Sequence, residues 1–361
     1  MATLLTEDDV KAVLTMADTV EVTEEAFRQY ALGTVQVPLR IGVKIPAHNG
    51  FHGVMQAYVG GDTDALAVKT GSMYRENPTK HDLPGIILYV MLYDPTNGSL
   101  LAIMGGNHLT AMRTAAVCGV ATKYLARQDA EVLGLFGAGV EGRTQIMAIH
   151  EVRPLKKVKI FDAVPGKAAS LAEEMAAATD IEISAVDDPQ EAVVGCDVVS
   201  ATTSATTPVF EGRWLEDGTH VNAIGSHAPD VQELDSDTVV RAKVVVDSKE
   251  AVLAEAGDLI VPIKEGRISE DHVYAELGEL ITGAKKGRSS ESEITLFKSV
   301  GLALQDAAAA AKTYQLAKEK GIGTEVAFWY HGSWRPPDLL CQQVALPREA
   351  SVLVHECHLP I

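Results

Sequence analysis

The residues with the clearest chemistry form a glycine-rich turn, Gly137-Ala138-Gly139-Val140-Glu141-Gly142. The turn follows an apolar run at 132–136 and precedes a stretch with helical periodicity. Gly137 permits a tight turn, Gly139 lets a pyrophosphate approach the backbone, and Gly142 lets the helix pack closely on the strand. The start of the following helix presents free N–H groups and a partial positive charge to phosphates. The turn therefore predicts a dinucleotide-binding site.

The acidic residue Asp162 indicates which dinucleotide is bound. It lies 20 residues after Gly142, at the end of the next expected strand. A carboxylate there accepts hydrogen bonds from both ribose hydroxyls and repels a 2′-phosphate, which favours NAD. Lys167 follows closely and leaves NADP possible. FAD is the other ligand of such turns, although FAD-binding turns usually lie near the start of a chain.

Candidate cofactor contacts lie at the ends of two further expected strands. Thr202, Thr203 and Ser204 come after the run 198–201, and Ile224 and Gly225 end the run that starts at 220. Because the carboxyl ends of parallel strands line the binding crevice, Thr202, Thr203 and Ile224 are expected to contact the same cofactor. The alternative for each is an ordinary polar loop.

The first third of the chain predicts mixed helix and sheet. Thr6, followed by three acidic residues, is typical of a helix start, and a second helix at 23–32 should end at Gly33. Asp94 to Gly98 predicts a hairpin. The expected strands, which make an antiparallel-rich sheet, are 36–44, 53–58, 65–72, 86–93 and 99–104.

In the middle third, strands and helices alternate, which predicts an α/β fold with a doubly wound parallel sheet of the Rossmann type. From about residue 295 an alanine-rich helix should run to 320 and stop at Gly321. The stretch 327–361 has no periodicity and is expected to be a poorly specified tail, or else a docked extension. The expected strands are 131–136, 158–161, 181–185, 198–201, 220–224 and 243–246, and the expected helices are 141–151, 166–178 and 190–194.

Composition excludes several classes of protein. The chain has 361 residues, with 49 acidic against 31 basic side chains and a net charge of −18, which argues against nucleic-acid binding. Its 4 cysteines are too few and too scattered for a disulfide framework or a zinc site, so no metal is expected. We expect no signal peptide and no membrane span, because the start is acidic and the apolar runs are short. These features indicate a soluble, cytoplasmic protein.

Several motifs occur in a fixed order along the chain. With them the chain resembles the ornithine cyclodeaminase/mu-crystallin family over about residues 1–325. The motifs are Lys69 before Asn77-Pro78, Leu109-Thr-Ala-Met-Arg113-Thr-Ala-Ala, the Gly137 turn, Asn222-Ala-Ile-Gly-Ser, Gln232-Glu-Leu-Asp235, and Thr295-Leu-Phe-Lys-Ser299-Val-Gly-Leu-Ala.

The resemblance implies both an assembly and a division into domains. It implies a homodimer whose substrate and dimerisation domain combines residues 1–118 with 300–326. An NAD(P)-binding domain, residues 119–299, is inserted between them. Members of the family act on small amino, keto or imino acids, by ornithine cyclisation, alanine dehydrogenation, cyclic ketimine reduction or opine-like chemistry.

The resemblance also implies residue roles. Lys69 is the expected proton donor and acceptor, and Arg113 and Arg40 are expected to hold the substrate carboxylate, with Arg113 and Ser299 also contacting the cofactor. A guanidinium binds a carboxylate bidentately and fixes which face of the α-carbon meets the nicotinamide. A lysine beside two arginines should have a lowered pKa, which suits proton transfer near neutral pH.

Two departures from the family pattern bear on the reaction. The cyclodeaminase branch has an aspartate where this chain has His227, and a threonine where it has Pro84-Gly85. His227 is therefore a possible acid or base, while ornithine cyclodeamination is disfavoured. His81 and His108 are interpreted as ordinary polar residues.

The expected function is an NAD(P)-dependent oxidoreductase of the alanine dehydrogenase or ketimine reductase type, which transfers hydride at the substrate α-carbon. The alternatives are ornithine cyclodeaminase and a non-enzymatic NADPH-binding protein like mu-crystallin.

Overall fold

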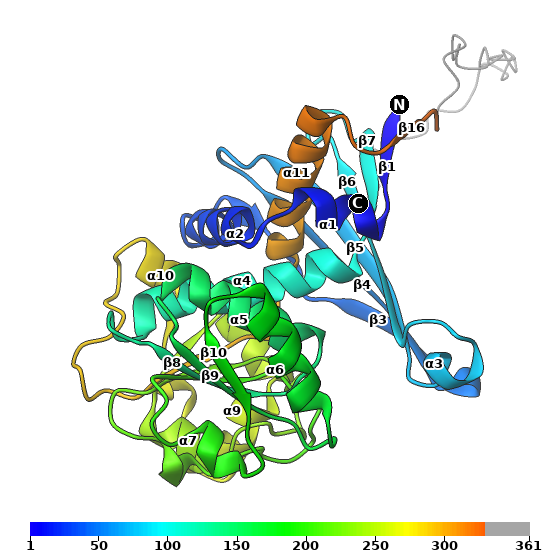
Figure 1. Ribbon diagram of the computed structural model, residues 1–361. Coiled ribbons are helices and arrows are strands. Elements are labelled where there is room, and N and C mark those ends of the chain that lie inside the picture. Colours follow the sequence, from blue (N-terminus) through cyan, green and yellow to red (C-terminus); the bar gives the residue numbers. More distant parts are fainter. Residues whose placement is uncertain (329–361) are drawn as a thin grey trace, which may run out of the picture. The chain divides into compact units, whose positions relative to one another are not determined.

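The computed structural model describes residues 1–328, of which residues 1–326 form one compact unit built on two eight-stranded sheets (Figure 1). The expectation for the stretch 327–361 concerns residues that lie almost entirely outside the described part of the chain. No helix within residues 1–328 combines the length and the apolar character needed to cross a bilayer.

The first sheet is mostly antiparallel, as expected, and has the order β16-β1-β7-β6-β5-β4-β2, with β3 paired to β4. Only β1 and β7 pair in parallel. The predicted hairpin joins β6 to β7, where the N–H of Asp94 donates to Ser99 O. Its strands are β1 (Ala2–Leu5), β2 (Val35–Gln36), β3 (Ile41–Ile45), β4 (Gly50–Val59), β5 (Ala65–Tyr74), β6 (Ile86–Tyr93), β7 (Leu100–Gly105) and β16 (Thr324–Val326).

One face of this sheet is covered by helices. On β5 the alternate residues Ala65, Ala67 and Lys69 are buried, because α11 (Ala303–Lys320) packs against β4, β5 and β6 (Figure 1). The helices α1 (Glu7–Val13) and α2 (Met16–Ala31) pack in turn against α11. Thr6 caps α1 as predicted, with its hydroxyl accepting from the N–H of Asp9. Lys69 therefore points toward the buried, helix-covered face.

The second sheet is entirely parallel, as expected, with the order β10-β9-β8-β11-β12-β15-β13-β14. Its strands are β8 (Val132–Phe136), β9 (Lys157–Phe161), β10 (Glu182–Ala185), β11 (Val198–Ala201), β12 (His220–Ala223), β13 (Lys243–Val246), β14 (Val273–Glu276) and β15 (Thr295–Lys298). Its helices are α5 (Val140–Val152), α6 (Lys167–Ala178), α7 (Ser236–Arg241), α8 (Lys249–Glu255), α9 (Gly257–Lys264) and α10 (Leu277–Ile281).

The structure corrects several expected elements. Residues 295–298 form the strand β15 instead of the start of the last helix, because all four are buried between β12 and β13. The expected helix at 190–194 is a short 3-10 turn, η2 (Pro189–Ala192). Helix α2 begins at Met16 instead of residue 23, since Thr15 caps it. The strands β1, β14 and β16 and the short helices α7 to α10 were not predicted.

Helix α4 (Asn107–Leu125) connects the two sheets. It contacts α2 and α11 on the side of the first sheet and α5 and β12 on the side of the second (Figure 1). Most of its residues are buried, which suits a helix enclosed on several sides. The expected boundary at 118–119 lies within this helix, so a single rigid element spans both parts. This helix carries Arg113.

Candidate active site

The glycine-rich turn has the geometry that a pyrophosphate requires. Gly137 has φ +98°, a conformation that favours glycine. A Cβ on Gly142 would lie 2.1 Å from Gly137 O, whereas nothing lies within 4 Å of a Cβ placed on Gly139. Helix α5 begins at Val140 and directs its free N–H groups toward this open space. The residues present therefore fit a dinucleotide.

Asp162 lies directly after β9, as predicted, and supports the turn. Its carboxylate accepts the N–H of Ala138 at 2.8 Å and the N–H of Val164 at 2.8 Å. The Thr202 hydroxyl donates to Phe136 O at 2.9 Å, next to Gly137. Asp162 and Thr202 thus stand on either side of the glycine turn.

The other predicted cofactor residues lie at the same edge of the parallel sheet, after β11, β12 and β15. Thr203 and Ile224 follow β11 and β12. Ser299 follows β15, and its hydroxyl donates to the buried Asp247 at 2.7 Å. The Ser299 side chain therefore supports the segment between β15 and α11.

The sequence analysis did not predict two buried acidic residues at this edge, Glu233 and Asp258. The buried Glu233 accepts from the N–H of Thr203 at 2.5 Å and from that of Gly225 at 2.6 Å, which joins the loops after β11 and β12. Asp258 accepts from the N–H of Glu233 at 2.7 Å and pairs with Lys298 at 2.8 Å. The Gln232-Glu-Leu-Asp235 motif was the signal that could have revealed this role.

The predicted catalytic lysine lies in a buried ionic cluster formed by three elements. From β5, Lys69 Nζ lies 2.9 Å from an oxygen of Asp306 on α11. From α4, Arg113 Nε donates to Asp306 Oδ1 at 2.9 Å. The side chains of Lys69, Arg113 and Asp306 are 6%, 7% and 1% exposed, so the two cations share one carboxylate away from solvent.

Burial and neighbouring charges set the protonation of this cluster. Burial, and then the charge of Arg113, lower the pKa of Lys69 to about 8, although Asp306 opposes the shift. Burial alone would raise the pKa of Asp306, but the charges of Arg113 and Lys69 outweigh it and hold that pKa below its ordinary value. Asp306 therefore remains a carboxylate, while Lys69 can exchange a proton near neutral pH.

Arg40 contacts the segment between β15 and α11, next to the cluster. Its Nη2 donates to Gly301 O at 2.9 Å, and its Nε lies 3.2 Å from Glu255. A Cβ on Gly301 would lie 2.8 Å from Arg113 Nη1, so glycine at this position leaves room for the Arg113 guanidinium. A small cavity of about 20 Å³ lies here, lined by Arg40, Gly301 and Met55, which is the cross-strand neighbour of Lys69. Lys69, Arg113 and Arg40 thus come together as predicted.

Two more titratable groups face these cations. Glu141, on the first turn of α5, has a buried oxygen without a hydrogen-bond partner among residues 1–328. Its burial raises its pKa to about 7, and Arg113 and Lys69 only partly oppose this. Desolvation by the surrounding protein, and then the charges of Lys298, Arg40 and Arg113, lower the pKa of His227. Part of the His227 side chain is nevertheless exposed to solvent. His227 is therefore neutral at pH 7.

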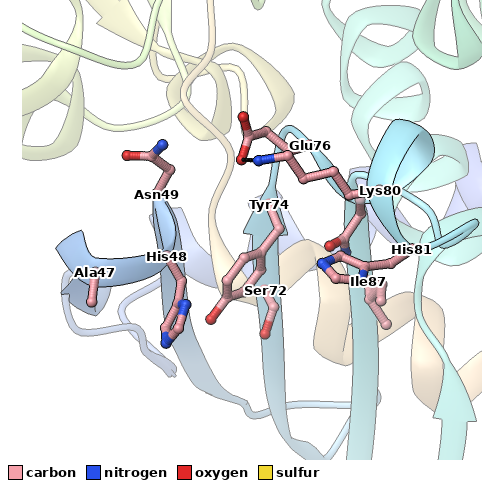
Figure 2. Close-up of a pocket in the computed structure, with 10 residues that line it drawn as sticks. Ala47, His48, Asn49, Ser72, Tyr74, Glu76, Lys80, His81 and Ile87 are labelled. Carbon is pink, nitrogen blue, oxygen red and sulfur yellow. Dashed lines mark hydrogen bonds and ion pairs between the residues drawn. The ribbon is translucent and has the colours of Figure 1, made fainter.

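A larger cavity of about 530 Å³ lies on the other face of the first sheet (Figure 2). Ser72 and Tyr74 of β5 line it, and they alternate with Lys69 along the strand. The turn η1 (Pro46–His48) and the one-turn helix α3 (Asn77–Lys80) contribute His48 and Lys80. None of Lys69, Arg113 and Asp306 lines this cavity. We place the active site at the ionic cluster, because the candidate proton donor and the carboxylate-binding arginine lie there.

The chain is similar to solved structures that hold NADH or NAD and to a curated dehydrogenase. The structure of the Δ1-pyrroline-2-carboxylate reductase of Thermococcus litoralis, in complex with NADH and L-proline, is 47% identical, with a TM-score of 0.86, over 90% of this chain and 100% of that one. An archaeal alanine dehydrogenase dimer with bound NAD is 35% identical, with a TM-score of 0.85, over 91% and 99% of the two chains. The alanine dehydrogenase of Archaeoglobus fulgidus is 37% identical over 90% of this chain and 98% of its own length.

The family model described as "Ornithine cyclodeaminase/mu-crystallin family" matches residues 1–321, which include the glycine turn, Lys69, Arg113 and Asp306. The resemblance drawn from the sequence is thereby confirmed. The chain belongs to the ornithine cyclodeaminase/mu-crystallin family.

Proposed function

We propose that the protein is an NAD(P)-dependent reductase of a small cyclic imino acid, of the Δ1-pyrroline-2-carboxylate type. The observation that carries this proposal is the buried cluster in which Lys69 and Arg113 share Asp306. A cyclic imino acid has one carboxylate and one imine nitrogen, and the cluster offers a guanidinium for the first and a proton for the second. The solved relative at 47% identity acts on this class of substrate.

Each cation has a distinct role. Arg113, assisted by Arg40, binds the substrate carboxylate and thereby fixes which face of the α-carbon is presented. Lys69 protonates the ring nitrogen during reduction and takes the proton back during oxidation. Burial of the cluster excludes water, which strengthens these charged contacts.

The cofactor is held at the edge of the parallel sheet. The glycine turn and the start of α5 bind the pyrophosphate, and Asp162 binds the adenosine ribose, which favours NAD over NADP. Thr202, Thr203, Ile224 and Ser299 complete this edge of the site. When bound, the nicotinamide supplies or accepts the hydride at the substrate α-carbon.

Alanine dehydrogenation is the second candidate, because the relative from Archaeoglobus fulgidus covers nearly the whole chain. It uses the same carboxylate and nitrogen contacts on an open-chain substrate. Ornithine cyclodeamination fits less well, since the neutral His227 offers no carboxylate to a side-chain ammonium group.

A spectrophotometric screen tests the proposal. Oxidation of NADH or NADPH is followed at 340 nm with Δ1-pyrroline-2-carboxylate, Δ1-piperideine-2-carboxylate, or pyruvate plus ammonia. We expect Lys69→Met to lower kcat/KM about 10²- to 10⁴-fold while NADH binding is retained. Ornithine turnover without net change at 340 nm would indicate a cyclodeaminase, and tight NADPH binding with no turnover would indicate a binding protein.

We also propose that the protein is a homodimer formed through the face of the first sheet opposite α11. Two adjacent cross-strand rows, Ile41-Val54-Thr70-Tyr89 and Val43-His52-Ser72-Ile87, cross that face. Ile41, Val43 and Tyr89 are 71%, 64% and 51% exposed. Such a concentration of exposed apolar side chains is typical of an interface.

We propose the cytoplasm as the location of the reaction. Cys118 and Cys196 are both free thiols, as is usual in a reducing compartment.

A further inference from the structure

We propose that Asp306 is a positioning residue of the reaction. Its carboxylate holds the Lys69 ammonium and the Arg113 guanidinium in one arrangement and supplies the negative charge against which Lys69 gains and loses its proton. This inference rests on the proposed function, because it concerns the same proton transfer.

The first argument is the charge balance of the cluster. Lys69 Nζ and Arg113 Nε both lie 2.9 Å from Asp306, and all three side chains are almost fully buried. Two cations so close together, and without solvent, would repel each other and favour loss of the lysine proton. Buried ion clusters seldom add stability compared with apolar packing, so the cluster is better explained by its chemistry than by the fold.

The second argument is the orientation of Arg113. Its Nε is bound by Asp306, and its Nη1 donates to Gln305 Oε1 at 3.1 Å. Gln305 in turn accepts the N–H of Leu302 at 2.8 Å and so caps α11. Within residues 1–328, Nη2 of Arg113 makes no hydrogen bond, which leaves it free for the substrate carboxylate. The first turn of α11 therefore directs the guanidinium.

The third argument is the proton balance. During reduction, the α-carbon accepts a hydride from the reduced nicotinamide, which is thereby oxidised, and a new C–H bond forms there. The electrons of the C=N π bond move to the ring nitrogen, which takes the Lys69 proton, so one N–H bond breaks at Lys69 and another forms on the ring. Asp306 stays ionised throughout, because Arg113 remains charged beside it. After the product and the oxidised cofactor leave, water can reach Lys69 and return its proton, and the Asp306 charge stabilises the restored ammonium.

The test compares three variants. Asp306→Asn removes the charge at nearly constant shape, and Asp306→Glu keeps the charge at a changed length. Asp18→Asn is the matched control. Asp18 pairs with Lys312 of α11, the helix that carries Asp306, at 3.1 Å, but Asp18 contacts neither Lys69 nor Arg113 among the hydrogen bonds and ion pairs of residues 1–328. Two readouts of the free protein are used: the pH profile of kcat/KM for imino-acid reduction, and the titration of the Lys69 13Cε NMR signal, assigned by its absence in Lys69→Met.

For Asp306→Asn we expect both titration midpoints to fall by about one to three pH units, since an opposite charge at this distance shifts a pKa by that amount. Asp306→Glu and Asp18→Asn should keep the wild-type midpoint, even if Asp306→Glu lowers kcat. If Asp306→Asn does not fold, Asp306→Ser is used, with the same expected shift.

An unchanged midpoint in the uncharged variant, or an equal shift in Asp306→Glu, would overturn the inference. If the wild-type protein reduces no imino acid, the proposed function fails, while the NMR titration still reports whether Asp306 controls Lys69.

Discussion

At the scale of single residues, the chemistry depends on opposing influences at Lys69. Burial and Arg113 favour the neutral amine, whereas Asp306 favours the ammonium, and the outcome is a pKa of about 8. An exposed lysine titrates about two units higher, near 10.4. The lysine can therefore be both a proton donor and a proton acceptor within the working range of most enzymes.

This pKa predicts opposite pH profiles for the two directions of the reaction. Reduction needs protonated Lys69, so its kcat/KM should fall as the pH rises through about 8. Oxidation needs the neutral amine, so its kcat/KM should rise over the same range. Both profiles are measured at substrate concentrations well below KM, because kcat/KM reports the pKa values of the free enzyme. A titration of Glu141, whose pKa is about 7, is the alternative source of such a limb.

Glu141→Gln separates the two sources. If the limb near pH 8 disappears in Glu141→Gln and survives in Asp18→Asn, then Glu141, not Lys69, controls it.

The sequence predicted some of these residues and not others. Lys69, Arg113 and Arg40 were assigned through a family resemblance. The comparisons confirm the family, and the roles of the three residues stay a prediction. Asp306 was missed because acidic residues commonly lie on the solvent-facing side of a helix, and nothing in the sequence marked this one as buried. Only the fold shows that Asp306 lies on the side of α11 that contacts Lys69 of β5 and Arg113 of α4.

At the scale of elements, the connection between β8 and α5 depends on two glycines for different reasons. Gly142→Ala should lower the stability by about 1–3 kcal/mol, because its Cβ would lie 2.1 Å from Gly137 O. Gly139→Ala should fold normally, since its Cβ meets nothing within 4 Å, but it should weaken NADH binding by filling the space for the pyrophosphate.

Thermal unfolding and NADH titration measure the two effects separately. Equal loss of stability in both variants would contradict this assignment, and so would unchanged NADH affinity in Gly139→Ala.

The elements also show which strands the apolar pattern of the sequence predicts and which it does not. The parallel strands β8, β9, β11, β12 and β13 were predicted nearly to the residue, because short apolar runs alternate there with helices. The four residues of β15 were taken for the start of α11, since apolar residues in the middle of a sheet resemble those of a buried helix. Their place between β12 and β13 is decided by contacts with strands far away in the sequence.

At the scale of the whole molecule, the exposed rows on the first sheet predict an assembly. Ile41→Glu together with Val43→Glu should convert a dimer into a monomer, because burying two carboxylates without partners is costly. Leu32→Glu is a matched control, since Leu32 is 55% exposed and lies after α2. Light scattering after size-exclusion chromatography gives the mass. A wild-type monomer, or a double variant that remains a dimer, would refute this interface.

The position of Asp306 near the carboxyl end of the described chain has a consequence for biosynthesis. Lys69 and Arg113 emerge from the ribosome before α11, so the carboxylate of Asp306 that pairs with both of them is synthesised later. During translation the nascent polypeptide can complete the glycine turn and its parallel strands while the two cations still face water. A growing chain should thus acquire nucleotide affinity first and turnover only when α11 emerges.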